Sequence, residues 1–277
     1  MSAIEAILVA ILQGATELFP VSSLGHAVVL PAVLNMSLDE GAPEFLPFLV
    51  MLHLGTAAAL LLYFRRDWIG LARGVLGLAG GREAAASRRL FVMIVIATIP
   101  AALLGFALER HLRVLFGTPL VAAAFLVMNG FVLLLGERVR EYGHRQLATL
   151  RVSDALVIGL CQCTALIPGI SRSGATIVGG LLRGIDHAEA AHFSFLIATP
   201  IILGASILEI PKLLHEQVPS GVFSLSIIAA VVAGITAFLS TAFLMRYFRR
   251  HDEWALNPFA YYCFALGLGS FAWLVLR

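Results

Sequence analysis

Long apolar stretches alternate with short polar tracts along most of this chain. A helix needs about 20 apolar residues to cross the hydrocarbon core of a bilayer. Six stretches reach roughly that length: residues 45–64, 90–108, 119–136, 190–208, 222–245 and 258–276. The pattern therefore predicts six transmembrane helices.

Two further apolar regions are interrupted by polar residues, proline and glycine. Residues 6–38 are interrupted at Glu17, Pro20, Gly25, His26 and Pro31, and residues 155–182 at Pro168, Gly169 and the run Ser171-Arg172-Ser173-Gly174. Each region predicts two helices of about 10–13 residues joined by a polar elbow, which is typical of a re-entrant hairpin. With hairpins at 3–38 and 153–184, we expect an all-α integral membrane protein of about ten helical segments, six of them spanning.

Composition supports this class. Hydrophobic residues make up 60% of the chain and charged residues 13%, with a mean hydropathy of +0.92. A soluble domain is about half apolar and a quarter charged. The composition thus excludes a soluble enzyme, a disordered chain and a nucleic-acid binder, and it makes membrane lipids the surrounding partner.

Basic residues are distributed unevenly between the two faces of this layout. If both hairpins return to their own side, the basic residues of one face are Arg65, Arg66, Arg73, Arg82, Arg88, Arg89, Arg138, Arg140, Arg145, Arg151, Arg183, Arg246, Arg249 and Arg250. The other face holds only Arg110, Arg113, Lys212 and Arg277. Because basic residues concentrate in cytoplasmic loops, we expect the tracts 65–89, 137–151 and 246–257 in the cytoplasm, and both termini with the loops 109–118 and 210–221 outside.

The two hairpin regions also align with each other at an offset of 149 residues. The alignment pairs Gln13 with Gln162, Ser22 with Ser171, and Gly25 with Gly174. Each half, 1–149 and 150–277 of a single membrane domain 1–277, then holds one hairpin and three spans. Since three is odd, the second half is inverted relative to the first, and the two elbows are expected to meet near the bilayer midplane.

Few ionisable residues lie deep in the apolar segments. Glu17, Arg172, His26 and His53 do, and such groups are costly in a membrane unless they face a pocket or each other. A Glu17–Arg172 ion pair that locks the hairpins together is one interpretation. For His53, a helix–helix hydrogen bond and a functional role are equally compatible with the sequence.

The elbow residues favour an anion site as the other interpretation. Ser22, Ser23, Ser171 and Ser173 stand where N-caps of the second hairpin helices are expected, and Gly25 and Gly174 permit close backbone approach. Two helix N-termini would then direct N–H groups at one point, and Arg172 would add a bidentate donor suited to phosphate.

Two further groupings carry possible chemistry. Gln13 lies one helical turn before Glu17, and an amide with a carboxylate is a sparse oxygen site for Mg²⁺ or Ca²⁺. His26 follows Ser23 by three residues, which would supply a base and a nucleophile if both face inward. Activated water in place of Ser23 stays open.

At these residues the chain resembles the undecaprenyl-diphosphate phosphatase family (UppP, also called BacA). The stretch Gln13-Gly-Ala-Thr-Glu17-Leu-Phe-Pro-Val-Ser-Ser-Leu-Gly-His26 is similar to its first signature, and Pro168-Gly-Ile-Ser-Arg-Ser-Gly-Ala-Thr176 to its second. The resemblance covers essentially the whole chain. In many relatives a glutamate stands at the position of Gln13, and in some a glutamine at that of His53.

The resemblance implies a bacterial inner-membrane enzyme that dephosphorylates the C55 lipid diphosphate, depends on a divalent metal and confers bacitracin resistance when overexpressed. It implies Glu17, the pair Ser23 and His26, and the phosphate-binding Arg172 as catalytic residues. The elbow pattern adds Ser22, Gly25, Ser171, Ser173, Gly174 and Thr176 around the phosphate and Gln13 with Glu17 at the metal.

We therefore expect a polyprenyl-diphosphate phosphatase whose site opens to the periplasmic side. The alternative is a flippase of a polyprenyl phosphate, because inverted repeats with midplane half-helices are also transporter architecture. A flippase would need the anion site but not a Ser/His pair. A third interpretation gives the elbows a purely structural role in packing. The sequence does not fix the oligomeric state, and a homodimer is one alternative.

Overall fold

The computed structural model describes residues 2–34, 45–116, 118–140, 145–215 and 220–276. Within these ranges the regular structure is helical, apart from one isolated bridge between Arg145 and Ile185. The helices are α1 (Ala3–Thr16), α2 (Ser23–Leu34), α3 (Phe45–Tyr63), α4 (Arg65–Val75), α5 (Gly81–Phe116), α6 (Pro119–Val139), the 3₁₀ helix η1 (Leu147–Thr149), α7 (Val152–Thr164), α8 (Arg172–Leu181), α9 (His187–His215), α10 (Ser220–Arg250) and α11 (Asn257–Leu276). The prediction of an all-α chain is confirmed.

Six candidate spans are present among the described residues, as the apolar pattern predicts. Five single helices are long and apolar enough to cross a membrane, and α3 with α4 forms a sixth candidate that is bent by 77°. The sequence interpretation placed α4 in a loop because its arginines end the apolar stretch. The predicted loops 109–118 and 210–221 are also wrong in part, since α5 continues to Phe116 and α9 to His215.

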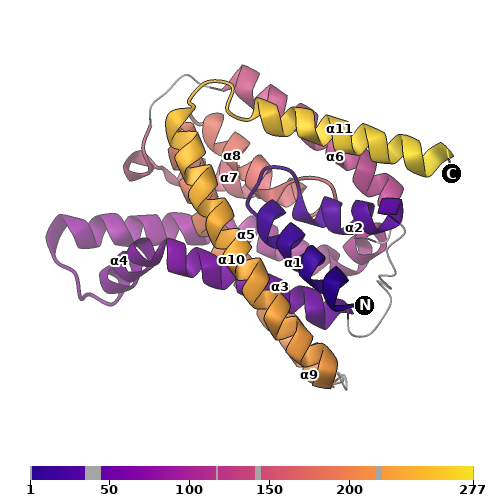
Figure 1. Ribbon diagram of the computed structural model, residues 1–277. Coiled ribbons are helices and arrows are strands. Elements are labelled where there is room, and N and C mark those ends of the chain that lie inside the picture. The colour runs from indigo at the N-terminus through magenta and orange to yellow at the C-terminus, as the bar shows by residue number, and fades with distance from the viewer. Residues whose placement is uncertain (1, 35–44, 117, 141–144, 216–219, 277) are drawn as a thin grey trace.

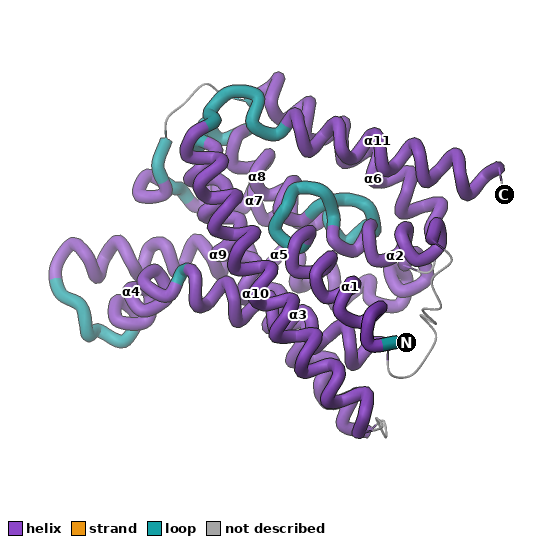
Figure 2. The backbone as a smooth tube through the Cα atoms, viewed as in Figure 1, coloured by secondary structure: helices purple, strands orange, loops and turns teal. Residues whose placement is uncertain are grey.

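The two interrupted regions each form a pair of short helices joined by a non-helical turn. We call residues 17–22, between α1 and α2, the first elbow, and residues 165–171, between α7 and α8, the second elbow. Figure 2 shows these turns as loops in the middle of the helical assembly. Residues 35–38 of the predicted first hairpin lie outside the described residues.

Close helix packing surrounds the first hairpin. α10 packs against both α1 and α3, and the contacts use Gly14 and Gly55. A Cβ at either glycine would collide with the α10 backbone, at Ala233 and Ala230 respectively. α11 packs along α6, and α6 contacts both α2 and α8, so α6 reaches both hairpins.

The chain ends and two of the turns between helices lie on opposite sides of the molecule. Figure 1 shows the N- and C-terminal ends on one side of the molecule, and the turns from α4 to α5 and from α10 to α11 on the opposite side. The turns on that opposite side belong to the arginine-rich tracts of the sequence.

Candidate active site

The two elbows meet in the interior of the molecule. The hydroxyl groups of Ser171 and Ser173 donate to the carbonyl oxygen of Phe19 at 3.3 and 2.9 Å. Phe19 belongs to the first elbow, whereas both serines belong to the second elbow or to the start of α8. The structure therefore brings together residues that lie about 150 positions apart, as the sequence predicted.

Each elbow ends in a serine that caps the following helix. The Ser22 hydroxyl accepts the backbone N–H of Gly25 at 3.2 Å, and the Ser171 hydroxyl accepts that of Gly174 at 3.1 Å. These are N-cap contacts of the expected kind. Ser23 and Ser173 do not cap, and their hydroxyls instead donate to Glu17 and Phe19.

Glycines allow close packing where the elbows touch. A Cβ at Gly25 would lie 3.1 Å from the Cα of Gly169 in the second elbow, which is tight. A Cβ at Gly174 would lie 3.4 Å from the Cβ of Pro20 in the first elbow, an ordinary contact distance. Gly169 also has a φ of +101° and lies against the α6 backbone, so it combines a left-handed conformation with a close approach.

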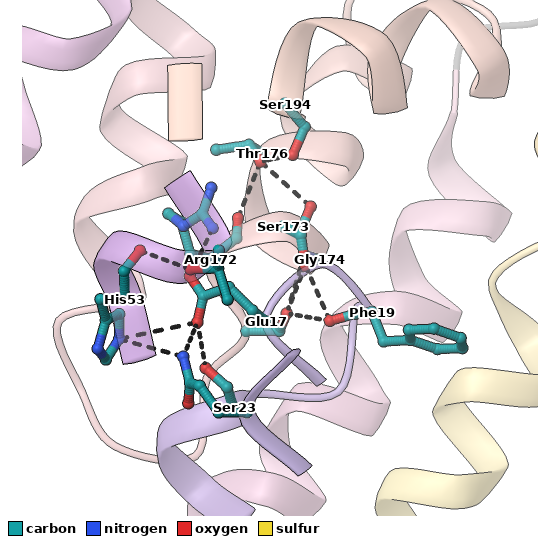
Figure 3. Close-up of polar contacts among 12 residues, drawn as sticks. Glu17, Phe19, Ser23, His53, Arg172, Ser173, Gly174, Thr176 and Ser194 are labelled. Carbon is teal, nitrogen blue, oxygen red and sulfur yellow. Dashed lines mark hydrogen bonds and ion pairs between the residues drawn. The ribbon is translucent and has the colours of Figure 1, made fainter. Parts of the chain in front are cut away.

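Glu17 is the centre of the polar contacts drawn in Figure 3. Its Oε1 accepts from Nη2 of Arg172 at 2.9 Å, which is the ion pair that the sequence suggested. Its Oε2 accepts from the Ser23 hydroxyl at 2.7 Å and from Nε2 of Gln13 at 2.8 Å. Glu17 as a residue is 8% exposed, so these donors replace most of the hydration of its carboxylate.

Arg172 keeps one nitrogen without a partner. Its Nη1 is buried and has no hydrogen-bond partner within the described part of the chain. A buried unpaired donor is costly, and an arginine fork is suited to oxyanions. The backbone of the same turn is held by Thr176, whose hydroxyl donates to the Arg172 carbonyl at 2.8 Å and contacts the Ser194 hydroxyl at 2.7 Å.

His26 is placed differently from the expected Ser23–His26 pair. Its Nδ1 contacts the Ser22 carbonyl at 2.6 Å and its Nε2 the Tyr262 hydroxyl at 2.8 Å, and its ring stacks on that of Tyr262. Because a carbonyl only accepts, Nδ1 carries a proton, and Nε2 of a neutral ring then accepts from Tyr262. Within the described part of the chain no hydrogen bond joins Ser23 to His26, because both imidazole nitrogens are engaged by the Ser22 carbonyl and Tyr262.

His53 points into the site from α3. Its Nδ1 donates to the Leu49 carbonyl at 2.8 Å, so in the neutral ring Nε2 is free to accept from Nε2 of Gln13 at 3.2 Å. The same Nε2 lies 3.9 Å from Oε2 of Glu17. This contact joins α3 to α1, so the helix–helix hydrogen bond considered for His53 is present, and a functional role for it stays a prediction.

Two residues of this region were missed in the sequence interpretation. Asn129, in α6, contacts both elbows, and Tyr262, in α11, holds His26. Asn129 had a signal that could have found it, since it is the lone amide within the apolar stretch 119–136. Tyr262 had none, because tyrosine is common in transmembrane helices and its partner lies 236 residues away.

The protein side chains at this site provide few ligands for a metal ion. Among the described residues, no group of three or more His, Cys, Asp or Glu side chains is placed to hold one. Glu17 supplies a carboxylate. The amide nitrogen of Gln13 donates to that carboxylate, so the Gln13 side chain would have to turn before its carbonyl oxygen could act as a metal ligand. Mg²⁺ commonly binds through one or two carboxylates, with phosphate and water completing its shell. The residues present fit that sparse arrangement.

Comparison with known proteins gives matches along nearly the whole chain. The family model described as "Bacitracin resistance protein BacA" matches residues 6–269. The chain is 62% identical to the undecaprenyl-diphosphatase of Granulibacter bethesdensis over 99% of its own length and 97% of that protein. It is 57% identical to the undecaprenyl-diphosphatase of Acidiphilium cryptum over 96% of each chain, and 49% identical to undecaprenyl-diphosphatase 2 of Chromobacterium violaceum over 97% of each.

Proposed function

The chain belongs to the BacA family of bacitracin resistance proteins, and on that basis we propose that it hydrolyses undecaprenyl diphosphate to undecaprenyl phosphate and inorganic phosphate. The single observation that carries the proposal is identity of 50–62% to undecaprenyl-diphosphatases over nearly the full chain. The product would be the lipid carrier of cell-wall synthesis, and the family description names bacitracin resistance.

The site residues divide between binding and reaction. Arg172 would bind the diphosphate through Nη1, the donor that has no partner within the described chain. The N-terminus of α8, with its positive dipole end, lies at the same place. Phosphoryl transfer depends chiefly on such positioning and charge neutralisation.

Ser23 is the proposed nucleophile and Glu17 its proton acceptor. The Ser23 hydroxyl already donates to Oε2 of Glu17 at 2.7 Å. As Oγ attacks the terminal phosphorus, its proton moves to Glu17 and the bond from that phosphorus to the bridging oxygen breaks, which releases undecaprenyl phosphate. Water then cleaves the phosphoserine to give inorganic phosphate. His26 would orient the start of α2 through the Ser22 carbonyl and Tyr262.

A divalent cation, Mg²⁺ or Ca²⁺, is proposed to bind with the substrate at Glu17 and Gln13. When bound, it would neutralise negative charge on the phosphate oxygens. Gln13 is neutral and donates to Glu17 in the structure. We therefore expect the cation to take most of its oxygen ligands from diphosphate and water.

Membrane placement forms a further part of the proposal. We propose a multi-pass inner-membrane protein with both termini outside and a site accessible from the periplasmic side, built from two inverted repeats. Support comes from the arginine distribution and from the equivalent caps of the elbows, Ser22 on Gly25 and Ser171 on Gly174, which are related by the offset of 149 residues. In this arrangement the hairpins would be re-entrant.

Phosphate release from C55 diphosphate by the purified protein tests the function. We expect release that stops on addition of EDTA and returns with excess Mg²⁺ or Ca²⁺. Release unaffected by EDTA would remove the cation from the proposal and leave the phosphatase. If wild-type protein reconstituted in lipid releases no phosphate, the phosphatase function itself is contradicted, and the flippase becomes the remaining alternative. The names of the relatives do not favour a flippase.

A further inference from the structure

Asn129 lies between the two elbows on a helix that belongs to neither hairpin. It is fully buried, at 0% exposure, near the middle of α6. α6 contacts α2 on one side and α8 on the other. A polar side chain at this depth is costly unless its donors and acceptors are all used.

The amide uses both of its ends. Its Nδ2 donates to the carbonyl oxygen of Pro20, in the first elbow, at 2.9 Å, and contacts the Cys263 sulfur at 3.3 Å. Its Oδ1 accepts from the backbone N–H of Ser171, in the second elbow, at 3.0 Å. The orientation of the amide is fixed by its partners, because a carbonyl only accepts and a backbone N–H only donates.

The Pro20 carbonyl and the Ser171 N–H lie shortly before the proposed reactive residues in the sequence. Pro20 precedes Ser23 by three positions, and Ser171 immediately precedes Arg172. The Ser171 N–H cannot bond within α8, because it lies at the cap of that helix. One side chain thus ties the chain entering α2 to the chain entering α8.

We propose that Asn129 is a positioning residue for the phosphatase reaction, which sets the place of the Ser23 hydroxyl relative to the Arg172 guanidinium. The inference rests on the proposed function, since it concerns the geometry of that same site. Ser173 provides a second tie between the elbows through the Phe19 carbonyl, so Asn129 is not the sole connection and its loss leaves the hairpins in contact. The expected defect is therefore in alignment rather than in assembly.

Asparagine suits this place because its head group carries a donor nitrogen and an acceptor oxygen on a short side chain. Leucine, which is larger but branches in the same way at Cγ, has neither, and would leave the Pro20 carbonyl and the Ser171 N–H without their partner. Aspartate keeps the shape and the acceptor, but as a carboxylate it opposes the Pro20 carbonyl. Protonated aspartate restores a donor in the same place, because its O–H can replace the amide N–H.

The test compares Asn129→Leu and Asn129→Asp with wild type and with Thr241→Val, all purified and assayed for phosphate release from C55 diphosphate. Thr241 is a matched control, because it is fully buried in α10 and, among the described residues, its hydroxyl bonds only to the Ala237 carbonyl of its own helix, at 2.7 Å. We expect Asn129→Leu to lower kcat by about 100-fold, the scale of a 1 Å misplacement, with a much smaller change in KM. Thr241→Val is expected to keep the wild-type kcat.

The pH profile separates positioning from a general loss of packing. We expect the kcat of Asn129→Asp, relative to wild type, to rise as the pH is lowered from about 9 to about 5, because burial favours the neutral acid and the acid restores the donor. Asn129→Leu should show no such recovery.

Several outcomes overturn the inference. A wild-type kcat in folded Asn129→Leu would do so, whatever its thermal stability, because the residue would then be structural only. So would a relative kcat of Asn129→Asp that does not change with pH, or failure of both variants to fold, which would make Asn129 a determinant of assembly. Absence of activity in wild type would instead contradict the proposed function, and the parallel wild-type assay identifies that case.

Discussion

Ser22 and Ser23 are adjacent residues with different hydrogen bonds. Ser22 has a φ of +69°, and its hydroxyl accepts from the Gly25 backbone. Ser23 begins α2, and its hydroxyl donates to Glu17. The left-handed residue turns the chain sharply between them, so that one serine caps the helix and the other faces the carboxylate.

We expect Ser23→Ala to lower turnover by at least about 1000-fold, because a nucleophile has no substitute. A hydroxyl that only hydrogen-bonds phosphate would cost about 10–150-fold, mainly in binding. Phosphate release over a range of substrate concentrations measures the two quantities. Ser240→Ala, a buried serine of α10, is the matched control. A loss confined to KM would assign the attack to water.

The two terminal nitrogens of Arg172 have different surroundings. Nη2 bonds to Glu17, and Nη1 is free within the described chain. A lysine would keep a charge for Glu17 but lose the second donor. We expect Arg172→Lys to fold and to lose about 100-fold in kcat/KM. Near-normal kcat/KM would instead support the interpretation of a simple ion pair that locks the hairpins.

Among the elements, the second elbow depends most on glycine. A Cβ at Gly169 would lie within 2.5 Å of the Ala122 carbonyl and 2.7 Å of the Phe125 Cβ, on a backbone with φ of +101°. Gly204, in α9, faces open space.

We expect Gly169→Ala to lower both the midpoint of thermal unfolding and the activity, because α6 would have to move away from the elbow. Gly204→Ala is the control, and it should be neutral or stabilising by up to about 1 kcal/mol. Thermal unfolding in detergent, with phosphate release, measures both variants. Equal midpoints for the two variants would mean that the elbow is not closely held against α6.

The elements were predictable from the sequence to different degrees. The spans follow from the length of apolar runs, and the hairpins from the glycine, proline and serine that interrupt those runs. α4 was missed because Arg65 and Arg66 end the apolar signal while its helix continues as an amphipathic segment. The contact between Glu17 and Arg172 was predictable, because opposite charges inside a membrane protein stabilise each other. The orientation of the His26 ring depends on Tyr262 from a distant helix, and no local sequence pattern encodes that contact.

At the scale of the whole molecule, the arginine distribution predicts orientation. With the native cysteines replaced, single cysteines at positions 80 and 215 should be labelled by an impermeant reagent from opposite sides of the membrane. Position 80 precedes α5, and position 215 ends α9. Labelling of both from the same side would contradict the inverted-repeat proposal, and permeabilised cells provide the control for accessibility.

Stability at low pH depends on the buried Asp154 at the start of α7. Burial alone would raise its pKa, but Arg145, the Arg151 N–H and Arg183 together lower the pKa from 3.8 to about 2. Arg145 and Arg183 bind the carboxylate at 2.6 and 2.8 Å. Because the pKa is lowered on folding, this contribution is fully present above about pH 4 and is lost as the pH falls towards 2.

We expect Asp154→Asn to destabilise the protein by about 1–3 kcal/mol at neutral pH, since both guanidinium groups lose their anionic partner. The difference in unfolding midpoint between wild type and Asp154→Asn should shrink as the pH is lowered from about 4 to about 2. Thermal unfolding in detergent at several pH values measures it. A difference that does not change over that interval would show that the carboxylate charge is not the source of the stability.

The ion pair between Glu17 and Arg172 has a consequence for the end of the catalytic cycle. An arginine buried among helices carries a counterion already, so in the proposed binding at the free Nη1 the guanidinium shares its charge between phosphate and Glu17. When inorganic phosphate leaves, Glu17 still neutralises the guanidinium, and departure would cost less than it would from an isolated guanidinium. A site built in this way limits how tightly its own product is retained, which favours repeated turnover over storage of the anion.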